Sequence, residues 1–166
     1  MCDAVSRKAN IRSAVAEKST GSNVLVGRYD HGLDPKFRLM IPAEWRAALG
    51  DPEYVYVFPD PAHECLDLIP KEEMEKRLES LRERAIFDAS LTDDLQAISE
   101  SAKQLMVDTA GRIRISNKLL AFAGLTDVVA MVGAVRMARL WNPARLGPAD
   151  KVDVERFRSA AARLGF

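Results

Sequence analysis

This chain of 166 residues has few cysteines and histidines, and it has no excess of charge of either sign. Its two cysteines, Cys2 and Cys65, and its two histidines, His31 and His63, do not have the spacing of metal ligands. We therefore expect neither a disulfide framework nor a zinc site, and a reducing cytoplasm is the expected compartment. The apolar runs are far shorter than the roughly 20 residues that span a bilayer, so no membrane association is expected.

Basic and acidic residues balance, with 24 of each and a net charge of zero. A DNA-binding domain commonly shows a basic footprint, although a neutral total can hide a local patch. Hydrophobic residues make up 48% of the chain and charged residues 29%, which is typical of a globular protein and not of a disordered one. The length suits one compact domain, or two small halves that share a core.

An internal repeat is the most informative feature of the sequence. Residues 33–41 align with residues 107–115, and five identical pairs keep the same offset of 74 positions. Two copies of a unit of about seventy residues account for nearly everything after the first 23 positions. The five pairs are Asp34 and Asp108, Arg38 and Arg112, Ile41 and Ile115, Ala47 and Ala121, and Gly50 and Gly124.

Both copies share one predicted order of elements. A strand leads into an Asp-x-x-x-Arg turn, a second strand follows, and a short helix then ends at Gly50 or Gly124, the residue type that favours a left-handed cap. Two further strands and a longer helix complete each copy. The strands after the turn are predicted over 38–41, 54–58 and 65–69 in the first copy, and over 112–115, 128–132 and 135–141 in the second.

The longer helices are predicted to be amphipathic. Apolar residues recur at helical spacing over 71–84 and over 92–103, opposite a charged or polar face. Such faces can cover the protein's own sheets or meet a neighbouring subunit. The helix predicted at the C-terminus places four apolar residues on one side, namely Val154, Phe157, Ala161 and Leu164.

Neither copy has enough strands to close a core alone. We therefore predict a β-rich α+β fold in which two hairpin units form one pseudo-twofold β-barrel flanked by amphipathic helices. The residues before the first copy are polar, carry no apolar core run and are not expected to be a signal peptide. The predicted parts are a flexible N-terminal arm over 1–22, a first repeat with its helix over 23–86, a connecting helix over 87–104, and a second repeat with the C-terminal helix over 105–166.

Two motifs carry a resemblance to a known family. The segment Gly27–Arg46 resembles the N-terminal signature of the MraZ family, in which a glycine and a polar-aromatic strand lead through Asp-x-Lys-Gly-Arg to an apolar strand and a proline-led helix. The segment Asp108–Arg112 resembles the family's second motif, Asp-x-x-Gly-Arg. The stretch 124–133 and Leu140-Trp141 also fit, so the resemblance covers roughly residues 24–165.

The resemblance implies a tandem of AbrB-like swapped-hairpin units that assemble as a ring. It also implies binding to repeated short sites upstream of the bacterial division and cell-wall gene cluster, regulation of that operon, and a cytoplasmic, nucleoid-associated location. The first motif departs from the family at Phe37, where the family has glycine. Because a bulky residue adopts a positive φ less freely than glycine, either the first turn has another shape or its DNA contact is altered.

The two repeated arginines, Arg38 and Arg112, are predicted to bind DNA. A guanidinium on a projecting turn can reach a phosphate or the acceptor edge of guanine. Asp34 and Asp108 are predicted to fix these turns. The alternative is that each aspartate and its arginine form only an intramolecular ion pair, with no role in binding.

Two further basic side chains lie next to the turns. Lys36, within the first turn, is expected to contact a phosphate. Arg114 alternates onto the same strand face as Arg112. The predicted DNA-binding set is therefore Arg38, Arg112, Lys36 and Arg114, with no catalytic or metal-binding residue.

Two functions remain open from the sequence. The first is a sequence-specific regulator whose homo-oligomer, for example a ring, spaces its arginine-bearing turns to match repeated sites in double-stranded DNA. The second is an oligomeric scaffold of the same fold that has lost specific DNA binding, which Phe37 and the zero net charge favour. The chain has no Gly-rich phosphate loop and no nucleophile elbow, so neither an enzyme nor a bound cofactor is expected.

Overall fold

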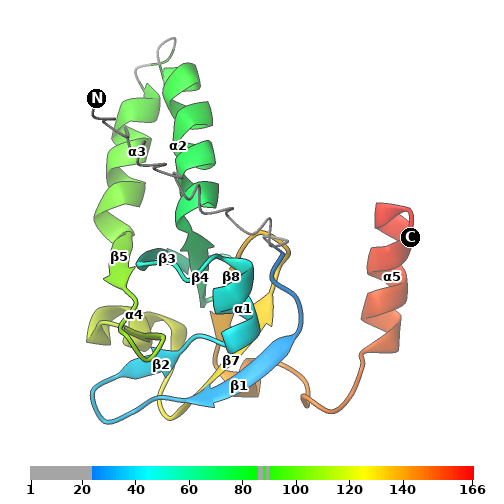
Figure 1. Ribbon diagram of the computed structural model, residues 1–166. Helices are drawn as coiled ribbons and strands as arrows, with labels where there is room; N and C mark the ends of the chain where they lie inside the picture. The colour runs from blue at the N-terminus through cyan, green and yellow to red at the C-terminus, as the bar shows by residue number, and fades with distance from the viewer. Residues whose placement is uncertain (1–23, 86–87, 89) are drawn as a thin grey trace, which may run out of the picture.

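The computed structural model describes residues 24–85, 88 and 90–166, so the predicted arm over 1–22 lies outside the described residues. Its main layer is a six-stranded antiparallel sheet with the strand order β1-β7-β8-β4-β3-β5 (Figure 1). Strands from both halves of the chain are mixed in it, because β1 pairs with β7 and β4 pairs with β8. The bounds are β1 (Arg28–Gly32), β3 (Tyr54–Asp60), β4 (Cys65–Pro70), β5 (Lys103–Met106), β7 (Val128–Gly133) and β8 (Ala138–Trp141).

A separate antiparallel ribbon consists of β2 (Arg38–Met40) and β6 (Arg112–Arg114). Leu39 lies opposite Ile113 at its centre. On either side of this pair, Arg38 faces Arg114 and Met40 faces Arg112. The register is therefore symmetric about the central pair of apolar residues.

The predicted α+β class is confirmed, but the predicted closed barrel is wrong. β1 and β5 are the two edges of the main sheet, and no ladder joins them within the part of the chain that the structure describes. The physical reason lies in the ribbon. β2 and β6 are each three residues long and pair with each other, so neither strand carries the main sheet from one edge to the other.

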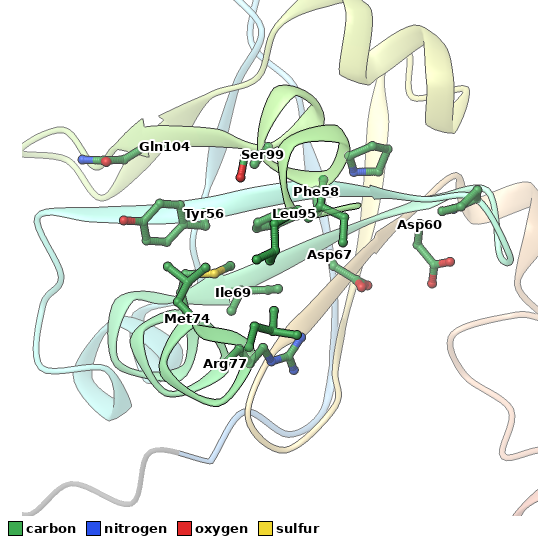
Figure 2. A pocket seen from close by; sticks show the side chains of 16 residues that line it. Tyr56, Phe58, Asp60, Asp67, Ile69, Met74, Arg77, Leu95, Ser99 and Gln104 are labelled. Carbon is green, nitrogen blue, oxygen red and sulfur yellow. The ribbon is translucent and has the colours of Figure 1, made fainter. Parts of the chain in front are cut away.

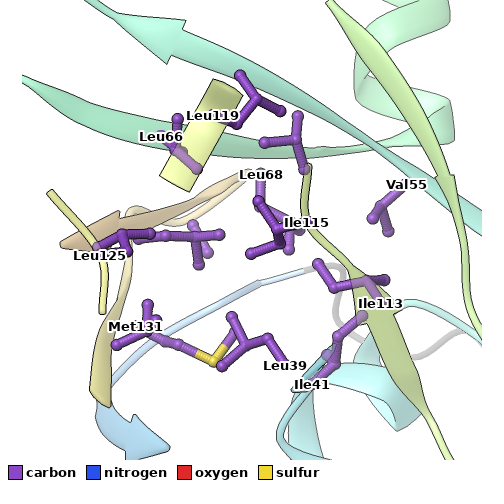
Figure 3. Packing of buried hydrophobic residues seen from close by; sticks show 14 of the residues in the cluster. Leu39, Ile41, Val55, Leu66, Leu68, Ile113, Ile115, Leu119, Leu125 and Met131 are labelled. Carbon is purple, nitrogen blue, oxygen red and sulfur yellow. The ribbon is translucent and has the colours of Figure 1, made fainter. Parts of the chain in front are cut away.

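The core lies between the ribbon and one face of the main sheet (Figure 3). Side chains alternate along the strands: Val55 and Val57 of β3 are fully buried, whereas Tyr56 and Phe58, each next to one of these valines, point away from the core. The ribbon contributes its central pair, which is also fully buried. The largest buried side chains include Trp45, Leu25, Leu39, Ile41, Leu66, Leu68, Ile113, Ile115, Met131 and Leu140.

Two short helices follow the two turns, as the sequence predicts. They are α1 (Ala43–Ala48) and α4 (Asn117–Ala123), and each packs apolar residues on the core, among them Trp45 of α1. Gly50 and Gly124 follow them with φ of 69° and 62°, the left-handed conformation in which glycine has no Cβ to clash.

The longer helices stand outside this body. α2 (Lys71–Ala85) and α3 (Ser90–Ser101) form a hairpin on one side of the molecule, and α5 (Val154–Leu164) stands apart on the other side (Figure 1). The helix predicted over 92–103 ends earlier because Lys103 already belongs to β5. The described helices are all too short or too polar to cross a membrane.

Replacing Ile113 by alanine tests the place of the ribbon in the core. We expect Ile113→Ala to lower the free energy of unfolding by about 2–5 kcal/mol, because it leaves a cavity beneath the ribbon. Met40→Ala, on the outer face of the same ribbon, should change it by less than about 1 kcal/mol. Urea unfolding followed by circular dichroism measures both variants. Equal effects would show that the ribbon does not seal the core.

Candidate nucleic-acid interface

The two Asp-x-x-x-Arg turns have the same backbone hydrogen bonds. In the first turn, the N–H of Asp34 donates to the carbonyl of Arg38 at 3.1 Å, and the N–H of Phe37 donates to the carbonyl of Asp34 at 2.9 Å. The equivalent bonds of the second turn measure 2.9 and 2.8 Å. Both turns are therefore tight, and both lead directly into a strand of the ribbon.

Each aspartate side chain accepts three hydrogen bonds within its own turn. Oδ1 of Asp34 accepts from the backbone N–H of Lys36 at 2.8 Å and of Arg38 at 3.0 Å, and Oδ2 accepts from Nε of Arg38 at 2.6 Å. Asp108 accepts the equivalent three bonds at 3.0, 2.9 and 2.9 Å. Each arginine is thus held at Nε, while its terminal amino groups make no hydrogen bond to the described residues.

These bonds keep both carboxyl groups ionised. For Asp34, burial raises the pKa, but the hydrogen bonds from Arg38 and Lys36 outweigh burial, so the pKa lies below the ordinary value. For Asp108, the backbone bond from Arg112 is the largest cause of a lowered pKa, and burial opposes it. Hydrogen bonding to the charged form therefore dominates in both turns.

Phe37 holds the position that Gly111 holds in the second turn, and both residues have a positive φ, of 58° and 80°. The first turn therefore keeps its shape despite the missing glycine. The two positions are not equivalent in space, however. A Cβ atom on Gly111 would lie 2.5 Å from Nε of Arg46, whereas Phe37 carries a full side chain and is 39% exposed.

Three arginines share the outer face of the ribbon. Because the central pair of the ribbon is buried, strand alternation places Arg38, Arg112 and Arg114 on the opposite face, together with Met40. The side chains of Arg38 and Arg112 are 30% and 31% exposed. The structure thus brings three of the four predicted DNA-binding residues onto one surface, with Lys36 exposed on the adjoining first turn.

Cross-strand pairing puts two of these cations face to face. Arg38 lies directly opposite Arg114, and like charges in that position destabilise a ribbon. Neither Arg114 nor the Lys36 ammonium makes a hydrogen bond or ion pair with the described residues. Sequence reasoning missed the opposition of Arg38 and Arg114. The repeat could have predicted it. If the two copies of the strand pair antiparallel with their equivalent apolar residues, Leu39 and Ile113, opposite each other, then Arg38 must lie opposite Arg114.

A second cluster of polar side chains is accounted for by ion pairs. Ligand-type atoms of Asp60, Cys65 and Asp67 lie within 4.8 Å of one another. Asp60 accepts a hydrogen bond from His63 at 2.7 Å, and both aspartates lie within 3.4 Å of the guanidinium of Arg139. Burial raises the pKa of the Cys65 thiol to about 12, so this sulfur stays protonated and is a poor ligand. We therefore interpret the cluster as a network of ion pairs and hydrogen bonds that supports the fold.

Substitutions at the two positions with positive φ, Phe37 and Gly111, test whether the two turns are packed differently. We expect Phe37→Gly to raise the free energy of unfolding by up to about 1 kcal/mol, because it removes the steric cost of a left-handed phenylalanine. Gly111→Ala should lower it by more than about 1 kcal/mol, because the new Cβ meets the buried part of Arg46. Chemical denaturation of both variants supplies the measurement. Stabilisation by Gly111→Ala would contradict this packing.

Curated proteins of known name resemble this chain over most of its length. A protein of Rhodospirillum rubrum named transcriptional regulator MraZ is 30% identical over 126 residues, which cover 73% of this chain and 81% of that protein. The protein of the same name from Caulobacter vibrioides is 30% identical over 120 residues, covering 72% and 77%. The one from Heliobacterium modesticaldum is 28% identical over 141 residues, covering 85% and 96%.

No protein-family model matches the chain. The relatives nevertheless align with it across most of both lengths, at identities that reach 30%. All three bear the name of a regulator of transcription. The chain belongs to the MraZ family.

Proposed function

We propose that this protein is a DNA-binding transcriptional regulator that binds repeated promoter sites of a bacterial division and cell-wall gene cluster as a homo-oligomer. The observation that carries the proposal is the outer face of the β2–β6 ribbon, where Arg38, Arg112 and Arg114 gather. The names of the relatives support the same function. A cytoplasmic, nucleoid-associated location follows from such a role.

The geometry of the ribbon suits a duplex. An antiparallel two-stranded ribbon fits the width of the DNA major groove, and its outward side chains then face base edges and phosphates. Because Asp34 and Asp108 hold only the Nε atoms, the terminal amino groups of Arg38 and Arg112 can each donate to a phosphate or to the acceptor edge of guanine. Lys36 on the first turn is placed to add a phosphate contact.

The local charge supports this proposal although the whole chain is neutral. The ribbon and its turns hold four basic residues and two aspartates, which leaves two positive charges. An anionic ligand between Arg38 and Arg114 would relieve the repulsion across the ribbon. Several copies in one oligomer would repeat this modest surface, and tethering raises the effective concentration of every contact after the first.

We also propose that the two halves are AbrB-like swapped hairpins, with repeats over 23–86 and 105–166 and a connecting segment over 87–104 that contains α3. The pairings β2 with β6 and β4 with β8 support this view, because each joins equivalent strands of the two halves. The alternative of a scaffold without DNA binding relied on Phe37 and on the zero net charge. The turn around Phe37 keeps the hydrogen bonds of its counterpart, which favours a regulator.

Removing the two turn arginines tests DNA binding directly. We expect Arg38→Ala and Arg112→Ala each to weaken binding to a duplex from the chain's own upstream region by roughly tenfold or more, because each loses a charged contact. The double variant should also show a shallower dependence of affinity on salt. Fluorescence anisotropy at matched ionic strength measures both effects.

Arg82→Ala is the matched control, because Arg82 is an exposed arginine on α2, away from the ribbon. It should bind the duplex like the native protein. Sedimentation of each variant checks that assembly is intact. Native affinity in both turn variants would remove the proposed contact, and equal binding of a random duplex would remove sequence specificity.

The pH dependence of stability tests the turn-fixing role of Asp34 and Asp108. Because their pKa values are lower in the folded protein than in the unfolded chain, the ionised carboxylates stabilise the fold above the unfolded pKa, and this contribution is lost as the pH falls through the folded pKa. The double variant Asp34→Asn, Asp108→Asn should therefore melt below the native protein at neutral pH. The gap in Tm should narrow as the pH falls from about 5 to about 2. A gap that stays constant over this range would speak against the role.

A further inference from the structure

An apolar groove of about 610 Å³ lies between the helical hairpin and the outer face of the main sheet (Figure 2). Its floor consists of side chains of β3 and β4 that alternate away from the core, among them Tyr56, Phe58 and Ile69. The apolar sides of α2 and α3 form its walls. The groove is therefore built from the same strands that support the core, but on their opposite face.

The walls of this groove stay exposed. Leu78 of α2 is 41% exposed and Ile98 of α3 is 51% exposed, although both belong to the apolar stripe of an amphipathic helix. Such stripes normally turn toward a packed partner. A contiguous apolar surface that lacks one commonly marks a site of protein association.

The C-terminal helix α5 also has an apolar side that no other described element covers. None of the residues of α5 is buried, and its apolar side includes Phe157, 67% exposed, and Leu164, 73% exposed. The helix is properly capped, since Asp153 accepts a hydrogen bond from the N–H of Arg156 at 3.0 Å and Gly165 ends it with φ of 76°. Because an isolated helix of 11 residues is marginal in water, α5 needs a surface to pack on.

The charges of the two elements are opposite. α3 has three acidic residues and no basic one, whereas α5 has three basic residues and one acidic one, a net charge of plus two. Helical spacing places Asp94 one turn before Ile98, which lines the groove, and Arg158 one turn after Val154 on the apolar side of α5. The remaining charged residues are Asp93 and Glu100 on α3, and Glu155, Arg156 and Arg163 on α5.

We propose that the apolar face of α5 docks into the groove between the helical hairpin and the sheet of a second copy of this chain. Val154, Phe157 and Leu164 would cover the exposed leucine and isoleucine side chains of the groove, with Arg158 next to the acidic rim of α3. This inference rests on the homo-oligomer of the proposed function and names the contact that forms it.

The arrangement of the two surfaces favours contact between copies. The hairpin and α5 stand on different sides of the molecule (Figure 1). Because helix and groove are different surfaces, each copy that donates its helix to one neighbour can accept a helix from another. Such head-to-tail contacts close into rings when the rotation between copies allows it.

A charge placed on either side of α5 tests the contact in the full chain without DNA. Phe157→Asp should weaken self-association at least tenfold, because it removes a large apolar anchor and buries a carboxylate. Ser159→Asp adds the same charge on the opposite side of the helix and should leave association near the native level. Sedimentation equilibrium over a range of concentrations gives the dissociation constants. Equal association of Phe157→Asp and the native chain would overturn the inference.

Cross-linking identifies the donor of the helix. In a Cys2→Ser background, one chain carries Ile98→Cys and another carries Val154→Cys, and the mixture is treated with a short bis-maleimide. A linked dimer that forms only in the mixture supports docking between copies, and Ser159→Cys in place of Val154→Cys should give little of it. A third sample is one chain that carries both Ile98→Cys and Val154→Cys. The inference is overturned if the mixture gives no linked dimer, or if linkage forms only within single copies of this double variant.

The outcomes separate this contact from the proposed function. If native and Phe157→Asp chains assemble equally, the docking contact is wrong, while an oligomeric regulator with another interface still stands. If the native chain sediments as a monomer, both the docking contact and the proposed homo-oligomer are wrong. DNA binding is measured separately through Arg38 and Arg112, so its loss or retention does not enter this test.

Discussion

The pairing of β2 with β6 is the constraint on which the rest of the molecule depends. Leu39 and Ile113 meet at its centre and are fully buried against the main sheet. Because side chains alternate along a strand, burying this pair forces their neighbours outward. A shift of one residue would put guanidinium groups in the core and expose the apolar pair, so the core itself fixes the register. The hydrophobic centre of the ribbon thus dictates where its arginines lie.

This arrangement has an electrostatic cost that the turns offset only in part. Asp34 and Asp108 neutralise one arginine each through Nε, but Arg114 stays unpaired opposite Arg38 among the described residues. A ribbon selected for stability alone would place opposite charges or β-branched residues across from each other. Local rules that are broken at one surface commonly mark a functional site. The unrelieved repulsion is therefore an argument for an anionic partner, independent of any family relationship.

Sequence patterns predicted the elements better than their closure. The Asp-x-x-x-Arg turns, the glycines after the short helices and the strands β3 and β4 depend on neighbouring residues, and these predictions hold. The prediction of a closed barrel was wrong because closure depends on strand length and on which strands pair with each other. Local sequence patterns do not encode either property. The opposition of Arg38 and Arg114 is likewise a matter of register between distant segments. Phe37 shows the limit of residue-type rules, since the surrounding turn imposes a positive φ on a residue that disfavours it.

Assembly and DNA contact use separate parts of this chain in our proposals. The arginines lie on the ribbon, whereas the exposed apolar residues of the groove and of α5 lie on elements outside the body. A neutral protein with two surplus positive charges at its ribbon cannot bind a polyanion tightly as a single copy, because affinity grows with the number of phosphates that it neutralises. Repeated copies multiply that number without changing any one contact. Repeated DNA sites would then be the natural target, since only they engage several ribbons at once, and a chain that loses its assembly contact would lose affinity while every arginine stays in place.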